Sequence, residues 1–451
     1  MSLSRSTVVL GSENAGLEPF RISTVAPRPN AIALASWHSL AWLVFANAVG
    51  VLIAALLLMP RINTLLTPWT YGRWMPVHID LQLYGWCSLP LVGFLLRAYG
   101  ADAGWTAAWC RPVLWIWSTA LGVGALSWIT GHSSGKLFLD WVGYPRVLFP
   151  LALMALWALL VAAFAASWSV ERTIGKWVKG IGLVALFAIP LLIYVAASPN
   201  LYPPINPDSG GPTGASQLES TLVIVAVLLL LPLGLTSGRQ RRSSSRVFCW
   251  LVFAAETLLC LGLGRADVSH HRPVQFMSLA SLLVWLPLIP MYYAGFVWHP
   301  NTKRWRIAFL AWWVVLVPTG WSLFLPGVLD HFKFTDGLVG HSLLAMAGFV
   351  SSLLIFVMVQ MMGNDGWIFN GTWSFYVWHL SVLAYVAIMF IAGWHEGTNP
   401  AFNILPGAAR NGIYALRLLL GVLIFLASLD WLIDANTMLR EKEAEAAGVT
   451  A

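Results

Sequence analysis

Two histidines stand near the beginnings of apolar segments: His78 in MPVHIDLQLYGW and His341 in FTDGLVGHSLLAMAGF. A histidine inside a membrane helix is energetically costly unless it is paired or ligates something. Two histidines at similar depth on different helices can supply the two axial ligands of a haem, because imidazole binds haem iron. The residues leave a second interpretation open, in which each histidine caps its helix or hydrogen-bonds a neighbour.

Three further side chains could take part in chemistry. His270 and His271 are adjacent in SHHRPVQF, and neighbouring histidines can bind copper, although the surrounding residues favour an ordinary outer loop. Glu256 lies inside an apolar run, FAAETLLC. An ionisable group at membrane depth indicates function by default. Glu256 therefore belongs either to a proton path or to a protonated, hydrogen-bonded structural position.

The elements that position these residues are membrane helices. Hydrophobic residues make up 58% of the 451-residue chain, charged residues only 10%, and the mean hydropathy is +0.73. Soluble proteins are nearer about 25% charged. The net charge of +7 is explained by basic loops between apolar runs, so we expect a lipid bilayer and no nucleic acid as partner. The four cysteines include no CxxCH motif, which excludes covalent c-type haem.

Runs of about 20 apolar residues span a bilayer as helices. The sequence predicts twelve, at 36–59, 79–98, 112–130, 146–168, 177–197, 219–236, 246–264, 274–298, 305–327, 336–362, 373–394 and 412–433. We expect an amino-terminal tail over 1–35, a transmembrane domain over 36–434 and a carboxy-terminal tail over 435–451. No internal repeat is obvious in the sequence.

Basic residues set the predicted orientation. They are concentrated in the amino-terminal tail and in every second loop, including GRQRRSSSR at 238–246. By the positive-inside rule both termini are cytoplasmic, and we expect a multi-pass protein of the inner membrane of a bacterium. Seven of the ten histidines, including His78 and His341, then lie toward the outer side.

The order of several segments resembles subunit I of the haem-copper oxidases, and within them the cbb-type cytochrome c oxidases and nitric-oxide reductases. The matching stretches are PVHIDLQLYGW (second helix), GHSSGKLFLDW (between the third and fourth), SLLVWLPLIPMYYAG (eighth), FTDGLVGHSLLAMAGF (tenth) and SFYVWHLSVLAYVAIMFIAGWHEG (eleventh). The resemblance implies a twelve-helix bundle in which His78 ligates a low-spin haem.

Departures from the family pattern are informative. The family's tenth helix carries HxH, whereas here His341 is followed two positions later by Leu343. The family's copper ligands lie on helices six and seven, and neither predicted span contains a histidine. His270 and His271 come about eight residues too late to replace them. We therefore expect b-type haem, one or two, on His78 and His341, and no copper.

Three functions follow from this. The favoured hypothesis is a divergent haem subunit that relays electrons in a respiratory complex, with other membrane subunits and a c-type cytochrome or similar donor as partners. The first alternative is an active terminal oxidase or nitric-oxide reductase, an oxidoreductase whose second metal would be bound by His270 and His271. The second alternative is a haem-free structural or assembly subunit.

Overall fold

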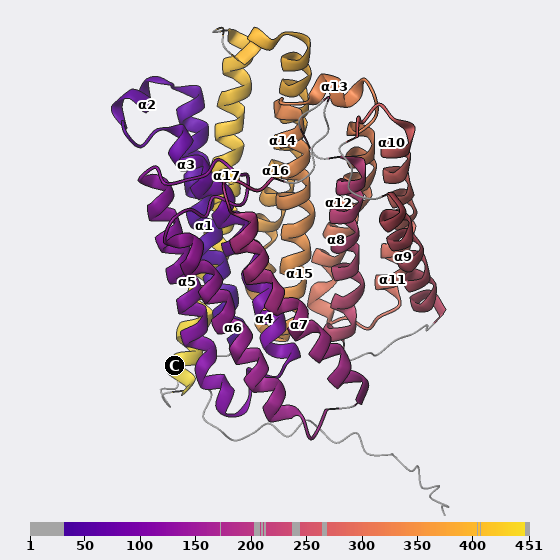
Figure 1. The fold of residues 1–451 in the computed structure, drawn as a ribbon. Helices are drawn as coiled ribbons and strands as arrows, with labels where there is room; N and C mark the ends of the chain where they lie inside the picture. Colours follow the sequence, from indigo (N-terminus) through magenta and orange to yellow (C-terminus); the bar gives the residue numbers. More distant parts are fainter. Residues whose placement is uncertain are drawn as a thin grey trace, which may run out of the picture.

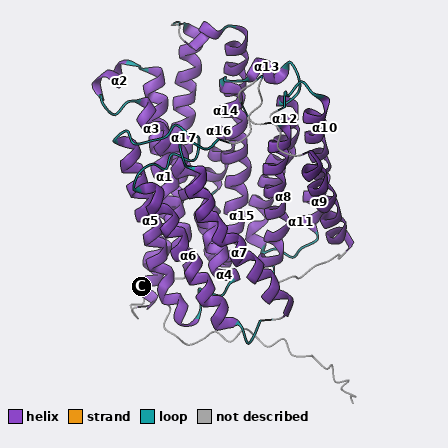
Figure 2. Cartoon of the chain, in the orientation of Figure 1, coloured by secondary structure: helices purple, strands orange, loops and turns teal. Residues whose placement is uncertain are grey.

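The computed structural model describes residues 31–171, 173–202, 208, 211, 213–236, 244–263, 268–403, 405 and 407–446. All regular elements in these residues are helices (Figure 2). Twelve of the described helical segments are long and apolar enough to cross a membrane. The prediction of an all-α protein with twelve transmembrane helices is therefore confirmed.

The twelve spans follow one another along the chain. The first six spans are formed by α1 (Ala31–Leu58), α3–η1–α4 (Tyr71–Asp80, Leu81–Cys87, Ser88–Ala98), η2–α5 (Gly104–Thr106, Ala107–Ile129), α6 (Pro145–Ser167), α7 (Thr173–Ala196) and α8 (Gly214–Leu235). The last six are α9 (Ser244–Leu263), α10–η3–α11 (Pro273–Ala280, Ser281–Val284, Trp285–Ala294), η4–α12 (Pro300–Thr302, Lys303–Leu323), α14–η5–α15–η6 (Asp336–Leu343, Leu344–Val350, Ser351–Met362, Gly363–Phe369), α16 (Thr372–Thr398) and α17 (Ala408–Ala446). Short helices α2 (Arg61–Leu65), α13 (Val328–Phe332) and η7 (Pro400–Asn403) lie in connections.

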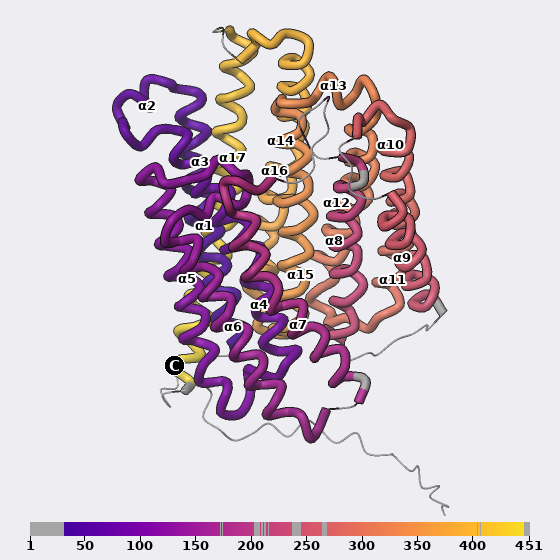
Figure 3. The backbone as a smooth tube through the Cα atoms, in the orientation of Figure 1, coloured from indigo at the N-terminus to yellow at the C-terminus, as the bar shows by residue number. Residues whose placement is uncertain are grey.

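The first and last spans are neighbours in space. Helix α17 packs along both α1 and α16, and α16 in turn packs on α14 (Figures 1 and 3). Helices α2 and α13 lie at the same end of the bundle, opposite the carboxy terminus (Figure 1). The connections that carry α2 and α13 therefore face the same side.

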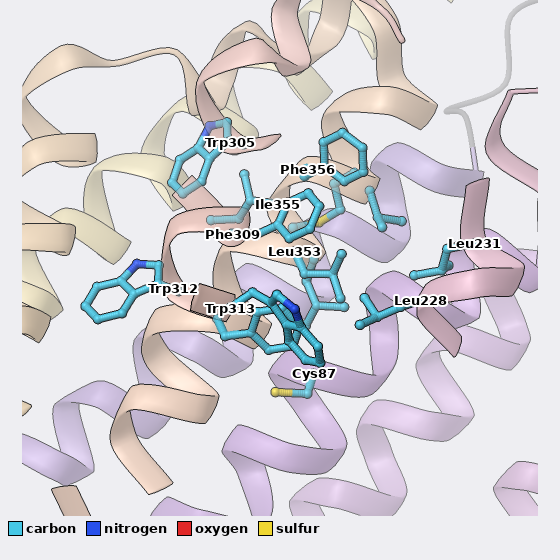
Figure 4. Packing of buried hydrophobic residues seen from close by; sticks show 14 of the residues in the cluster. Cys87, Leu228, Leu231, Trp305, Phe309, Trp312, Trp313, Leu353, Ile355 and Phe356 are labelled. Atoms are coloured by element: carbon cyan, nitrogen blue, oxygen red, sulfur yellow. The ribbon is translucent and has the colours of Figure 1, made fainter. Parts of the chain in front are cut away.

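Two apolar clusters hold the bundle together. The larger joins α12, α15 and α8, with the ring of Phe309 5.1 Å from that of Phe356, and Trp305, Trp313 and Leu228 are members of the same cluster (Figure 4). The smaller joins α1, α3, α5 and α6 around Trp128 and Trp141. Most spans are apolar all round, as expected where lipid rather than water covers the outside.

Several helix bounds differ by a few residues from the sequence-based expectation, and two of the differences bear on the site and the tails. The second span begins at Tyr71 rather than 79, because Arg73 and Pro76 lower the hydropathy of its first turns. His78 therefore lies two turns inside the helix instead of at its entrance. Helix α17 continues to Ala446, so the first part of the expected carboxy-terminal tail is helical.

Candidate functional site

His78 lies against the first span. Its Nδ1 is 2.7 Å from the carbonyl oxygen of Ala46. A carbonyl can only accept, so Nδ1 carries the proton and donates it, which leaves the lone pair on Nε2. A backbone carbonyl that holds the second ring nitrogen is the usual partner of a metal-bound histidine. The ring fits because position 50 is glycine: a Cβ there would stand 2.8 Å from Cε1 of His78.

His341 lies against the ninth span in the same manner. A Cβ at Gly320 would stand 3.2 Å from Cε1 and 3.3 Å from Nε2 of His341. Its Nδ1 is 3.5 Å from the hydroxyl of Thr319, which in turn lies 3.0 Å from the carbonyl of Leu316 and 2.8 Å from that of Val315. The threonine hydroxyl thus stands between this imidazole and the backbone, whereas His78 reaches the backbone directly.

The two histidine pockets share one construction. Gly85 follows His78 by seven residues, and Gly348 follows His341 by seven. Gly85 packs under Trp42 and Gly348 under Trp312, with Cβ positions 2.5 and 2.7 Å from the nearest tryptophan atoms. Trp42 precedes Gly50, the glycine that contacts His78, by eight residues. Trp312 precedes Gly320, the glycine that contacts His341, by the same number.

The helices themselves repeat as well. Each histidine is third from the end of an α-helical segment, α3 or α14, and a seven-residue π-helix follows directly, η1 or η5. Gly85 and Gly348 occupy the fifth position of their π-helices. Short π-helical segments inside α-helices are frequent at functional sites. A five-residue helix, α2 or α13, lies in each preceding connection. Spans one and two and spans nine and ten are thus built alike, a repeat that the sequence alone did not reveal.

The structure does not bring His78 and His341 together on one pair of helices. The main neighbours of α3 are α1 and α5, whereas those of α14 are α16 and η5, with α12 beside them. The His341 edge that carries Nε2 faces Gly320 of α12. The inner halves of the two spans do meet, since α4 packs on α15 and Trp86 Nε1 donates to Ser351 Oγ at 2.8 Å. Each histidine therefore has its own pocket.

A buried polar network lies near the first turns of the helices that carry His78 and His341. Arg417 donates to Asp336 at 2.6 Å, and the backbone amide of Asp336 donates to Glu396 at 2.7 Å. Tyr71, the first residue of the His78 helix, is close enough to interact electrostatically with Arg417 and Asp336. Sequence analysis missed this network, although Arg417 is a charged residue within an apolar run.

Glu256 is buried on α9. The indole nitrogen of Trp285 donates to its Oε2, and Ser281 also lies within hydrogen-bonding reach of the carboxyl. Trp313 Nε1 in turn donates to the backbone carbonyl of Trp285 at 2.9 Å. These contacts join the seventh, eighth and ninth spans, and the assignment of Glu256 to a proton path stays a prediction.

His270 and His271 lie with Asp330 of α13, which the sequence did not associate with them. His270 Nε2 is 3.1 Å from one carboxylate oxygen, and His271 Nε2 is 2.9 Å from the other. Partial burial favours the neutral carboxyl. However, hydrogen bonds from His271, the Gly327 amide and His270 outweigh it, and the pKa of Asp330 is held below its usual value. The pair thus belongs to the connection between α9 and α10, rather than to the sixth or seventh span.

No protein-family model matches the chain, and no curated protein matches it. The structure is similar to that of a heme-copper terminal oxidase dimer determined by cryo-EM, with a TM-score of 0.46, 12% sequence identity and coverage of 91% of this chain and 84% of that chain. Independently of this similarity, the described residues form an all-helical, multi-pass membrane protein with twelve candidate spans.

Proposed function

We propose that this protein is a membrane haem subunit that relays electrons, with His78 and His341 as iron ligands. The observation that carries the proposal is the hydrogen bond from His78 Nδ1 to Ala46, which fixes the tautomer with a free Nε2. A b-type haem bound there would supply a one-electron carrier within the bilayer. The residues of this chain orient the imidazole, hold its second nitrogen and exclude water.

The repeated construction supports two haem sites rather than one shared haem. Each histidine has its own glycine and its own partner for Nδ1. Leu343, two residues after His341, packs against the apolar core and offers no second ligand on that helix. The buried guanidinium of Arg417 lies near the outer end of both pockets, where a cation favours the carboxylates of a porphyrin.

The partners and the placement are part of the proposal. Because the sequence has no CxxCH motif, electrons would come from a c-type cytochrome or similar donor in another chain. The basic loops favour cytoplasmic termini in the inner membrane of a bacterium, within a complex of membrane subunits. The two histidines would then lie toward the donor's side of the membrane.

Haem content of the purified protein tests the proposal. A pyridine haemochrome assay on the wild-type protein is expected to give two b-type haems per chain, and His78→Ala and His341→Ala one each. His132→Ala is the matched control, because His132 is exposed and belongs to neither pocket. A His78→Ala protein that keeps its full haem spectrum would contradict the ligand assignment.

The same preparation separates the alternatives. An active terminal oxidase or nitric-oxide reductase contains a second redox metal beside a haem and consumes O₂ or NO with a reduced donor. A haem-free scaffold has no Soret band. Consumption of O₂ or NO with a reduced donor, measured beside the absorption spectrum, therefore distinguishes the three functions in one purification.

A further inference from the structure

We propose that His270, His271 and Asp330 bind one divalent transition-metal ion at the outer end of the bundle. The ligand atoms of the three side chains all lie within 4.8 Å of one another. The two nitrogen–oxygen separations, 3.1 and 2.9 Å, are close to the roughly 3.3 Å between ligand atoms of a tetrahedral zinc ion. Small movements would thus admit an ion.

Burial distinguishes this cluster from an ordinary surface ion pair. The side chain of His270 is fully buried, and its Nδ1 has no hydrogen-bond partner among the residues that the structure describes. A buried imidazole without partners is costly. Ligation would satisfy one ring nitrogen and fix the ring. His271, by contrast, is more than half exposed, so an ion can enter from the aqueous side.

The backbone around the cluster holds two of the three ligands in place. The amide of Gly327 donates to Asp330 Oδ2 at 3.0 Å, and the amide of His271 donates to Ser269 Oγ at 3.1 Å. Such second contacts orient metal ligands. The nearest competing cation is Lys333, whose Nζ is 3.7 Å from Asp330 Oδ1 and 3.3 Å from the carbonyl of Asp208.

The donor set selects the class of ion. Two imidazoles and one carboxylate suit zinc or copper(II), whereas calcium and magnesium prefer oxygen ligands. Three protein ligands leave a fourth position for water. The ion would join the connection before α10 to α13, two segments about 60 residues apart in the sequence.

The site is separate from the His341 pocket but lies near it. The ring of His270 is 6.4 Å from that of Phe324. Phe324 follows Gly320, which contacts His341, by four residues, or about 6 Å along a helix. A bound ion would therefore fix the outer connections above that pocket.

Titration with zinc measures the site directly. The chelator-treated full-length protein in detergent is expected to bind one Zn²⁺ by calorimetry. His271→Ala and Asp330→Asn, both at partly exposed side chains, should weaken zinc binding by at least about 100-fold. His395→Ala, on an outer histidine stacked on Phe402 rather than in the cluster, is the control.

Copper(II) provides an independent readout. Its EPR spectrum should show coupling to two nitrogens in the wild type and to one in His271→Ala. Saturable binding that survives in both variants, or the absence of saturable binding in the wild type, would overturn the proposal. Neither the zinc titration nor the copper(II) spectrum depends on bound haem. A protein that binds no metal ion at this cluster would therefore leave the proposed electron-relay function untouched.

Discussion

The imidazole of His78 lies against Gly50, where a Cβ atom would stand 2.8 Å from the ring. Gly50→Ala should therefore displace the imidazole and weaken haem binding in this pocket about 10- to 100-fold. The haem content of the variant, measured by the pyridine haemochrome assay, checks this. Gly122→Ala is the control, because a Cβ there meets nothing within 4 Å. Unchanged haem content in Gly50→Ala would contradict the pocket.

Thr319 offers a test confined to the His341 pocket. Thr319→Val keeps the side-chain shape but removes the hydroxyl between His341 Nδ1 and the Leu316 carbonyl. Loss of this partner should alter the basicity of the ligand and shift one midpoint potential on the order of 50 mV. Spectroelectrochemistry should show the other potential unmoved. Thr437→Val, on an exposed threonine bonded only within its own helix, should shift neither.

The buried ion pair between Arg417 and Asp336 should contribute strongly to stability. Asp336→Asn leaves an uncompensated guanidinium and is expected to lower the free energy of unfolding by about 3 kcal/mol. The comparison is Asp365→Asn in the more exposed Lys442–Asp365 pair, which should cost less than about 1 kcal/mol. Denaturant titration in detergent, followed by tryptophan fluorescence, measures both. Equal effects would count against a special role for the buried pair.

Glu256→Gln separates a proton-carrying from a structural role. Glutamine retains an oxygen that accepts from Trp285, so the fold should be preserved. If Glu256 takes up a proton when a haem is reduced, the pH dependence of the midpoint potential should become shallower in the variant. Glu443→Gln, at an exposed position near the end of α17, is the control. An unchanged slope would leave Glu256 as a structural residue.

The carboxyl of Asp140, in the connection before α6, should make the free energy of unfolding depend on pH. Burial raises the pKa of this carboxyl above 3.8, although amide and hydroxyl donors at Ser134 and Gly135 oppose the shift. The folded state therefore retains a proton that the unfolded state loses, and stability falls as pH rises from about 4 through the raised pKa. The backbone amide of Asp140 also faces the Asp80 carboxyl.

The measurement is the unfolding temperature between pH 4 and pH 7. The wild type should lose more stability over this range than Asp140→Asn. In the wild type the Gly135 amide donates to Asp140 Oδ1 at 2.7 Å, and asparagine keeps an oxygen that can accept this hydrogen bond. Asp365→Asn serves as the exposed control. The opposite order of wild type and Asp140→Asn would show that the carboxyl is stabilised as an anion.

The sequence by itself determined the number and nature of the spans. Apolar runs of bilayer length require helices, because only helices satisfy every backbone hydrogen bond within one segment in lipid. It also indicated His78, His341 and Glu256, since a titratable group stands out within an apolar run. The sequence did not predict the start of the second span correctly. Arg73 and Pro76 lower the local hydropathy, although the helix continues through both residues.

Only the tertiary structure decided what each histidine faces. Glycines at 50 and 320 resemble any other small residue of a membrane helix, and their use as imidazole pockets depends on how neighbouring spans pack. The Trp–Gly and His–Gly spacings are the same in the two pairs of spans, but most of the residues between these positions differ. The sequence therefore shows no obvious repeat. Asp330 joins His270 and His271 only through contacts between distant segments, which no local pattern encodes.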